Sequence, residues 1–405
     1  MEKQDKNEGE IWGYQQSFTV AGILLILGVA LEIISNGSGV GRIGSPANIY
    51  LFIGFAGFLA YTYFFFRQSP VVRWLMSVPA AISAITLFTF LVLILGFVPQ
   101  HAGFSEILHK IGFTHMKSSY PLLLAQVYFL LTLGMATLKR SHPFNKKNVG
   151  FLLNHFGLWL VIAAATLGSG DLYRLTIKLQ EGAEFKNMAV DKTMKLYRLP
   201  FQLKLHDFAI DQYNPKLALF DRRTGQLIDD SENLPFAEPG MEVDLKGMKI
   251  RVDTLYSGAF LFDSVYIPYD TIGASPVAHV TVINNRNQKI SGWIAAGSQR
   301  VRFRELPLSN TLALALTNPQ PRVYSSVIEV KTDEIHDTIT LEVNKPYKVK
   351  GYKIYQTGYD EQMGKWSQTS ILEAVHDPWL PVVYFGIFLL LAGAVYIFWI
   401  GKDIR

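Results

Sequence analysis

The sequence predicts a membrane protein: six transmembrane α-helices in a 5+1 arrangement, with a large exported, mainly antiparallel β domain between helices five and six. Three observations support this class. The chain has 405 residues and only 18% are charged, whereas soluble domains average about 25%. Its apolar residues gather in six long runs. Between the last two runs lie about 200 residues of ordinary soluble composition, enough for one or two packed domains.

Each apolar run is long enough for a membrane helix, because crossing the hydrocarbon core takes about 20 helical residues. The runs cover residues 18–34, 49–66, 74–98, 120–138, 149–168 and 380–400. The segment before the first run, MEKQDKNEGE, mixes acids with lysines, and further apolar runs follow at once. We therefore expect an uncleaved anchor and not a cleaved signal peptide.

Basic residues in the short loops predict the orientation, since such loops face the cytoplasm. Three regions carry them: Arg67 and Arg73; Lys139, Arg140, Lys146 and Lys147; and Lys402 and Arg405 after the last run. We expect a multi-pass protein of the cytoplasmic (inner) membrane with both termini cytoplasmic and an extracytoplasmic, periplasmic domain. The predicted parts are a two-helix N-terminal extension (1–75), three helices (76–170), the β domain (171–377), and the final helix with a short cytoplasmic tail (378–405).

The exported region shows the two-residue alternation of half-buried strands. In PFQLKLHDFAI (200–210), apolar Phe201, Leu203 and Leu205 alternate with polar residues. Four β-branched segments of strand length follow, at 248–256, 277–285, 324–332 and 337–343. The segment LSNTLALALTNP (308–319) is interpreted as a short helix.

The absence of cysteine excludes disulfides, cysteine-ligated zinc, iron–sulfur clusters and thiol redox chemistry in this chain. No nucleophile elbow, P-loop, Rossmann fingerprint or HExxH motif occurs. The chain therefore has no self-contained catalytic set. We expect the lipid bilayer as its surroundings and no nucleic acid as a partner.

His155 is the one histidine well inside an apolar run, FLLNHFGLWLVIAAATLGSG (151–170). Three interpretations stay open from the residues alone: a polar contact between helices, a proton relay, and metal ligation by a neutral ring nitrogen. Few carboxylates lie within the runs, which disfavours a relay. His155 follows Lys147 by eight residues, so at about 1.5 Å per residue it lies about 12 Å into the cytoplasmic half.

The remaining polar candidates have plainer interpretations. His101, His109 and His115 precede the fourth run and are expected to be exposed loop residues, with a metal-binding patch as the alternative. Glu32 is expected to reach interfacial water, and Trp379 to join the aromatic belt at the membrane surface.

Several segments resemble the ResB/CcsB family of system II cytochrome c biogenesis proteins. They are LVLILGFVPQ (91–100), GFTHMKSSYPLLLAQVYFLLTLGMATLKR (112–140), the histidine-containing run, and HDPWLPVVYFGIFLLLAGAVYIF (376–398). The most specific segment is EVNKPYKVKGYKIYQTGYD (342–360), with its Asn-Lys-Pro and Tyr-Gln elements. The resemblance covers residues 78–400 in order, so the first 75 residues are two additional N-terminal transmembrane helices.

The resemblance implies a membrane subunit of a cytochrome c synthase (haem lyase) that carries haem b across the membrane for attachment to a Cys-x-x-Cys-His apocytochrome c. It implies His155 as one axial ligand of the haem iron, with the second supplied by a CcsA-like, WWD-domain membrane protein. A thiol-reducing thioredoxin-like protein is a further expected partner. It assigns no catalytic residue here, and Asn344, Lys345, Pro346, Tyr355 and Gln356 are interpreted as fold-defining. The alternative is a haem-independent, membrane-tethered assembly factor or scaffold in which His155 only packs.

Overall fold

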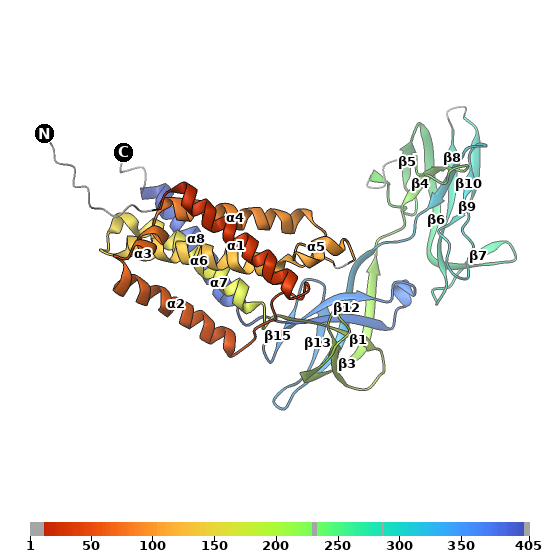
Figure 1. Cartoon of the computed structure of the whole chain (residues 1–405). Helices are drawn as coiled ribbons and strands as arrows, with labels where there is room; N and C mark the ends of the chain where they lie inside the picture. The colour runs from red at the N-terminus through yellow and green to blue at the C-terminus, as the bar shows by residue number, and fades with distance from the viewer. Residues whose placement is uncertain (1–11, 102, 229–232, 285–286, 401–405) are drawn as a thin grey trace. The chain divides into compact units, whose positions relative to one another are not determined.

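Figure 1 shows the computed structural model of the chain, which describes residues 12–101, 103–228, 233–284 and 287–400. The chain forms two compact units. The helical unit contains the residues up to Leu172 and those from His376 onwards, and the β unit runs from Tyr173 to Val375. The expectations for the N-terminal segment and for Lys402 and Arg405 fall outside the described residues. The predicted four-part division of the chain stays a prediction.

The helical unit is built from α-helices joined by short connections. Within the described residues they are α1 (Tyr14–Ile34), α2 (Ala47–Phe66), α3 (Pro70–Leu75), α4 (Val78–Phe97), α5 (Glu106–Lys110), α6 (Tyr120–Ser141), α7 (Val149–Gly168) and α8 (Leu380–Ile400). Two 3₁₀ turns, η1 (Met116–Ser118) and η2 (Lys146–Asn148), precede α6 and α7. Helices α1, α2, α4, α6, α7 and α8 are long and apolar enough to span a membrane. The six predicted apolar helices are thus confirmed as helices.

The third predicted run does not begin as one helix at residue 74. Trp74 belongs to the short α3, and the chain breaks before α4 starts at Val78. The hydroxyl of Ser77 accepts a hydrogen bond from the Ala80 amide, and Pro79 occupies the first turn of α4. Serine at the cap followed by proline is a helix start signal, so these local residues divide the apolar run.

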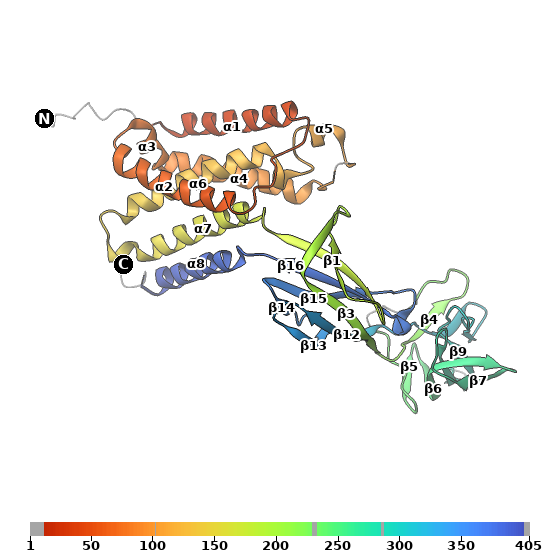
Figure 2. The same ribbon diagram turned by 90° about the horizontal axis from the view of Figure 1, so that it is seen from below.

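The long helices alternate in direction (Figure 2). Gly168 at the end of α7 contacts Trp379 just before α8, whereas Gly150 at the start of α7 contacts Ile397 near the end of α8. We call the end where α7 finishes and α8 begins the exit end, because the chain leaves for the β unit there. The other end, with the α2–α3 and α6–α7 connections, is the opposite end. Trp74 there donates to the Ser17 hydroxyl (2.8 Å), which places the start of α1 at the opposite end as well.

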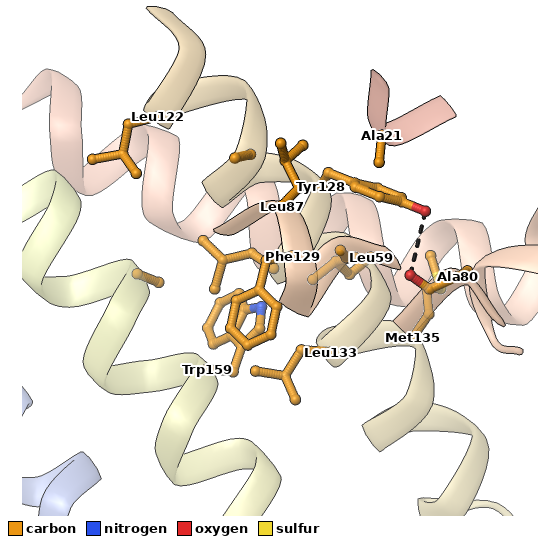
Figure 3. Packing of buried hydrophobic residues seen from close by; sticks show 14 of the residues in the cluster. Ala21, Leu59, Ala80, Leu87, Leu122, Tyr128, Phe129, Leu133, Met135 and Trp159 are labelled. Carbon is orange, nitrogen blue, oxygen red and sulfur yellow. Dashed lines mark hydrogen bonds between the residues drawn. The ribbon is translucent and has the colours of Figure 1, made fainter. Parts of the chain in front are cut away.

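The helical unit encloses one apolar cluster that includes the first two helices (Figure 3). Ala21 of α1 and Leu59 of α2 are buried together with Tyr128 and Trp159 of α6 and α7. The Tyr128 hydroxyl lies 3.3 Å from the Ala80 carbonyl oxygen and 2.8 Å from the Ser83 hydroxyl. Burial of a tyrosine among helices therefore comes with hydrogen bonds for its polar end.

The β unit contains three antiparallel sheets among the described residues. An eight-stranded sheet has the order β13-β12-β3-β2-β1-β16-β15-β14. Its strands are β1 (Tyr173–Gln180), β2 (Lys186–Val190), β3 (Leu196–Gln212), β12 (Pro321–Lys331), β13 (His336–Glu342), β14 (Tyr347–Val349), β15 (Tyr352–Tyr359) and β16 (Thr369–His376). The first and last strands of the unit, β1 and β16, are neighbours in this sheet.

The other two sheets come from the middle of the unit. Strands β4 (Leu217–Asp221), β10 (Leu306–Pro307) and β11 (Leu312–Leu316) form a three-stranded sheet. Strands β5 (Glu242–Leu245), β6 (Met248–Phe262), β7 (Val265–Pro268), β8 (Ser275–Ile283) and β9 (Lys289–Ala295) form a five-stranded sheet. One apolar cluster, which contains Leu219, Ile250, Val280 and Leu314, joins these two sheets.

The alternating segments predicted the strands correctly. The five segments expected as strands fall in β3, β6, β8, β12 and β13. The short helix expected in 308–319 is wrong, because Leu312–Leu316 forms β11 and pairs with β4 and β10. Its alternating leucine and alanine side chains are almost all buried, so packing inside the unit overrides the helical preference of these residues.

Candidate functional site

His155 lies in the second turn of α7 with its side chain half-buried. Its Nδ1 atom is 3.0 Å from the carbonyl oxygen of Phe151, one turn earlier in the helix. A carbonyl oxygen only accepts, so Nδ1 carries the proton and donates. The lone pair of the neutral ring is then on Nε2, which has no hydrogen-bond partner within the described part of the chain.

Neighbouring side chains fix the orientation of the imidazole ring. The ring stacks on the Phe151 ring, with centroids 3.6 Å apart and planes at 21°. Arg140, at the end of α6, makes a cation–π contact with Phe151. Its guanidinium carbon lies over the ring, 5.4 Å from the ring centroid. A positive charge therefore sits close to His155 near the opposite end of the unit. The sequence indicates Arg140 only as one of the basic loop residues, because its partner Phe151 lies on another helix.

The contact between α7 and α8 uses the face of α7 next to His155. A Cβ added at Gly157 would lie 2.7 Å from the Gly386 carbonyl oxygen, so the two backbones approach closely there. The Asn154 side chain points the same way, with its Nδ2 3.4 Å from the Leu390 carbonyl oxygen. Successive helical residues are turned by about 100°, so His155 points away from the α8 contact that Asn154 makes.

The donor set of His155 fits one axial position of a haem iron. The ring proton is on Nδ1, so Nε2 has the free lone pair that a histidine ligand needs. The backbone carbonyl of Phe151 holds Nδ1, as is common for histidines that bind metals. The described residues contain no group of three or more His, Asp or Glu side chains that could hold a metal ion by themselves. Within the described residues, His155 is thus a single possible ligand and not part of a metal-binding cluster.

A second polar cluster lies at the exit end, and it corrects two expectations. Glu32 was expected to reach interfacial water, but it is fully buried. Its carboxylate accepts from the His115 Nε2 (2.8 Å), the Gly39 amide (2.9 Å) and the Tyr120 amide (2.9 Å). The His115 side chain is only 19% exposed, so it is not an open loop residue.

The other loop histidines differ in their surroundings. The rings of His109 and His115 have centroids 4.8 Å apart, and His109 Nδ1 pairs with the Thr114 hydroxyl (3.0 Å). His101 is exposed. The cluster of Glu32, His109 and His115 forms no metal-ligand set within the described residues. Its hydrogen bonds hold the loop before α6 against the end of α1.

A third network, also at the exit end, joins residues that no local sequence pattern connects. The Asp171 carboxylate accepts from the Ser45 amide (2.6 Å), the Asn48 side chain (2.8 Å) and the Trp379 indole (2.9 Å). Burial acts to raise the pKa of Asp171, but these hydrogen bonds together lower it below its ordinary value. Trp379 was expected at the membrane surface but is only 8% exposed, because its indole N–H faces this carboxylate.

Three histidines of the β unit, His206, His279 and His336, form local ion pairs. His206 and His336 both face Glu329, and their hydrogen bonds lower the pKa of this carboxyl. His279 pairs with Asp253 at 3.0 Å. These are pairs on neighbouring strands, as the register of β3, β12 and β13 and of β6 and β8 shows. They form no metal-ligand set in the described residues.

Residues of the 342–360 segment make contacts that stabilise the β unit. Gln356 of β15 is buried, and its Oε1 accepts from the hydroxyls of Ser326 (2.6 Å) and Ser370 (3.1 Å). Asn344 adopts φ +65°, the left-handed conformation that asparagine tolerates in turns. These contacts account for the Gln and Asn of the segment without a ligand.

A family model matches part of the chain. The model of the ResB-like family matches residues 146–226 and 302–371. These segments contain α7 with His155, the 342–360 segment and most of the eight-stranded sheet. The five-stranded sheet falls in the gap between them, and residues 1–145 lie outside the match. No curated protein matches the chain.

Proposed function

We propose, from the premise that this chain belongs to the ResB-like family, that it is the membrane subunit of a system II cytochrome c synthase and carries haem across the cytoplasmic membrane. Membership of this family indicates a membrane protein of cytochrome c biogenesis, and the six apolar helices agree with it. The observation that carries the haem assignment is the state of His155: Nδ1 donates to Phe151, which leaves Nε2 free to bind iron.

His155 and its neighbours supply three properties that a haem-transfer site needs. The fixed tautomer presents one ligand nitrogen without a proton to lose. The Phe151 ring holds the imidazole plane. Arg140 places a positive charge beside them, suited to the carboxylates that haem carries on one edge. In this proposal His155 holds the iron and Arg140 pairs with a propionate.

The proposed orientation places the opposite end of the helical unit in the cytoplasm. Arg67, Arg73, Lys139, Arg140, Lys146 and Lys147 lie there, and basic short connections face the cytoplasm. The alternating helices then put the start of α1 and the end of α8 on the cytoplasmic side and the β unit on the periplasmic side. His155, in the second turn of α7, receives haem in the cytoplasmic half of the membrane.

Other proteins complete the proposed reaction. A CcsA-like subunit with a WWD domain supplies the second axial ligand, and an apocytochrome c supplies its Cys-x-x-Cys-His thiols. Haem contributes vinyl groups to which those thiols add. This chain has no cysteine, and in this proposal a separate thioredoxin-like protein keeps the apocytochrome thiols reduced. The role of this chain is to bind and position.

The test compares four variants of the complex purified with the CcsA-like partner: His155→Ala, His155→Asn, His155→Gly and His142→Ala. We expect b-type haem absorption to fall by tenfold or more in both His155 variants, because neither alanine nor asparagine ligates haem iron. His142→Ala removes a histidine from the α6–α7 connection and should keep the haem. Added imidazole should restore absorption in His155→Gly.

The scaffold alternative predicts another pattern. If His155 only packs, the asparagine variant keeps a side-chain donor for the Phe151 carbonyl and should behave like the wild type. Unchanged haem content and normal cytochrome maturation in His155→Asn would overturn the haem assignment and favour a haem-independent assembly factor.

A further inference from the structure

A cationic cavity lies at the opposite end of the helical unit, between the α2–α3 connection and the end of α6. Its volume is about 600 Å³, and it is lined by Tyr63, Arg67, Gln68, Arg73, Met76 and Lys139. Two guanidinium groups and one ammonium group thus surround one space, with no carboxylate among the lining residues. Nothing in the haem assignment uses this cavity.

The three cations have no anionic partner in the described chain. None of Arg67, Arg73 and Lys139 forms an ion pair with a described carboxylate, although such pairs are frequent in the β unit. The acids described in the helical unit are Glu32, Glu106, Asp171 and Asp377. Glu32 and Asp171 accept hydrogen bonds in the exit-end networks. Glu106 begins α5 and pairs with Lys110, and Asp377 caps the start of α8. The counter-anion for the cavity must therefore come from outside these residues.

The surroundings favour an anion that carries hydrocarbon chains. The last turn of α2, next to the cavity, exposes Phe64, Phe65 and Phe66, with Phe65 72% exposed. Val71 of α3 is also exposed. This exposed apolar surface ends at a cluster of cations. A phospholipid has the matching arrangement, because its acyl chains could lie along the apolar surface while its phosphate lies at the cations. Basic pockets between membrane helices bind anionic headgroups in this way.

We propose that this cavity is a binding site for the phosphate headgroup of an anionic phospholipid. Arg67 and Arg73 supply the forked N–H donors that suit phosphate oxygens, and Lys139 adds a point charge. The acyl chains lie along the exposed end of α2. The bound lipid neutralises three like charges that α2, α3 and α6 bring together, and so joins these helices at the opposite end.

The test measures lipid retained by the full chain in nanodiscs made from phosphatidylcholine with one fifth phosphatidylglycerol. The site variant is Arg67→Gln with Arg73→Gln. The matched control is Lys146→Gln with Lys147→Gln, which removes two charges at the same end but outside the cavity. After detergent extraction, native mass spectrometry counts the phosphatidylglycerol that stays bound. We expect the site variant to retain less by on the order of tenfold, and the control to match the wild type.

Three outcomes overturn the proposal. Equal losses in both double variants would show diffuse attraction to basic residues instead of a site. Unchanged retention in the site variant would show that the cavity binds no lipid. Displacement of phosphatidylglycerol by millimolar inorganic phosphate would show a site for free phosphate. A thermal unfolding midpoint equal to that of the wild type confirms that each variant is folded, and none of these readouts depends on haem.

Discussion

The indole N–H of Trp379 donates to the carboxylate of Asp171 across 2.9 Å, although 208 positions separate the two residues. Asp171 comes just before β1, and Trp379 comes just after β16. The chain therefore leaves the helical unit and re-enters it at two points joined by one buried hydrogen bond. Ser45 and Asn48 donate to the same carboxylate, so the connection between α1 and α2 is tied to this junction.

Asp171→Ala should lower the stability of the helical unit. The substitution leaves the Trp379 indole and the Ser45 amide without their acceptor, and each buried donor left unpaired costs about 1–3 kcal/mol. We expect a loss of about 2 kcal/mol or more, measured as a lower thermal unfolding midpoint in detergent. Asp333→Ala, at an exposed position of the β unit, is the control and should leave the midpoint unchanged.

The stabilising effect of Asp171 should depend on pH. Its pKa is lowered in the folded chain, so the folded state favours the ionised carboxylate and the unfolded state binds more protons near pH 4. The stabilisation that Asp171 gives the folded chain is complete above the pKa of this carboxyl in the unfolded chain, about 3.9. It is lost as the pH falls through the lower pKa of the folded chain. The thermal unfolding midpoint of Asp171→Asn should lie below that of the wild type by its largest amount at pH 6, and this difference should shrink below pH 4. A difference that grows on acidification would contradict this assignment.

Gly157→Ala should weaken the contact between α7 and α8. The added Cβ would lie 2.7 Å from the Gly386 carbonyl oxygen and 2.8 Å from the Leu390 amide nitrogen. Both are backbone atoms, so the helices must separate, at a cost of about 1–3 kcal/mol. Gly54→Ala on α2 is the matched control, because an added Cβ there has no neighbour within 4 Å. That variant should be as stable as the wild type or slightly more stable, since alanine favours helix.

Glu32→Gln should destabilise the exit end more than its small change in shape suggests. Both carboxylate oxygens accept hydrogen bonds, from Gly39 and His115 on one oxygen and from Tyr120 on the other. An amide replaces one acceptor with an N–H donor that faces another donor, at a cost of about 1–3 kcal/mol. Glu106→Gln changes an exposed carboxylate of the same region and serves as the control. Equal midpoints for the two variants would show that the Glu32 contacts add no stability.

The long helices and five of the strands could be predicted because their signals are local. Runs of apolar residues predicted the long helices, and alternation predicted β3, β6, β8, β12 and β13. The segment around Leu312–Leu316 was assigned incorrectly because its five alternating leucines and alanines favour helix locally, and only pairing with β4 and β10 decides the strand. The division of the third run was also local, but its Ser77 and Pro79 signals lie within a strongly apolar segment.

The polar networks could not be predicted because their partners are distant in the sequence. Glu32 and His115 are 83 residues apart, and Asn48 and Asp171 are 123 apart. Hydropathy alone placed Glu32 and Trp379 at the membrane surface, whereas their hydrogen-bond partners bury both. His155 was identified from its position in an apolar run, but its tautomer depends on the Phe151 carbonyl and on the turn of α7.

Leu59 of α2 covers the small surface at Gly134 of α6, where an added Cβ would lie only 2.7 Å from the leucine side chain. This flank of α6 is therefore already occupied by the chain itself. Without α2, the chain would expose Gly134 and the surface of α6 around it. In this protein the flank of α6 at Gly134 is closed to any further chain for as long as α2 stays packed there.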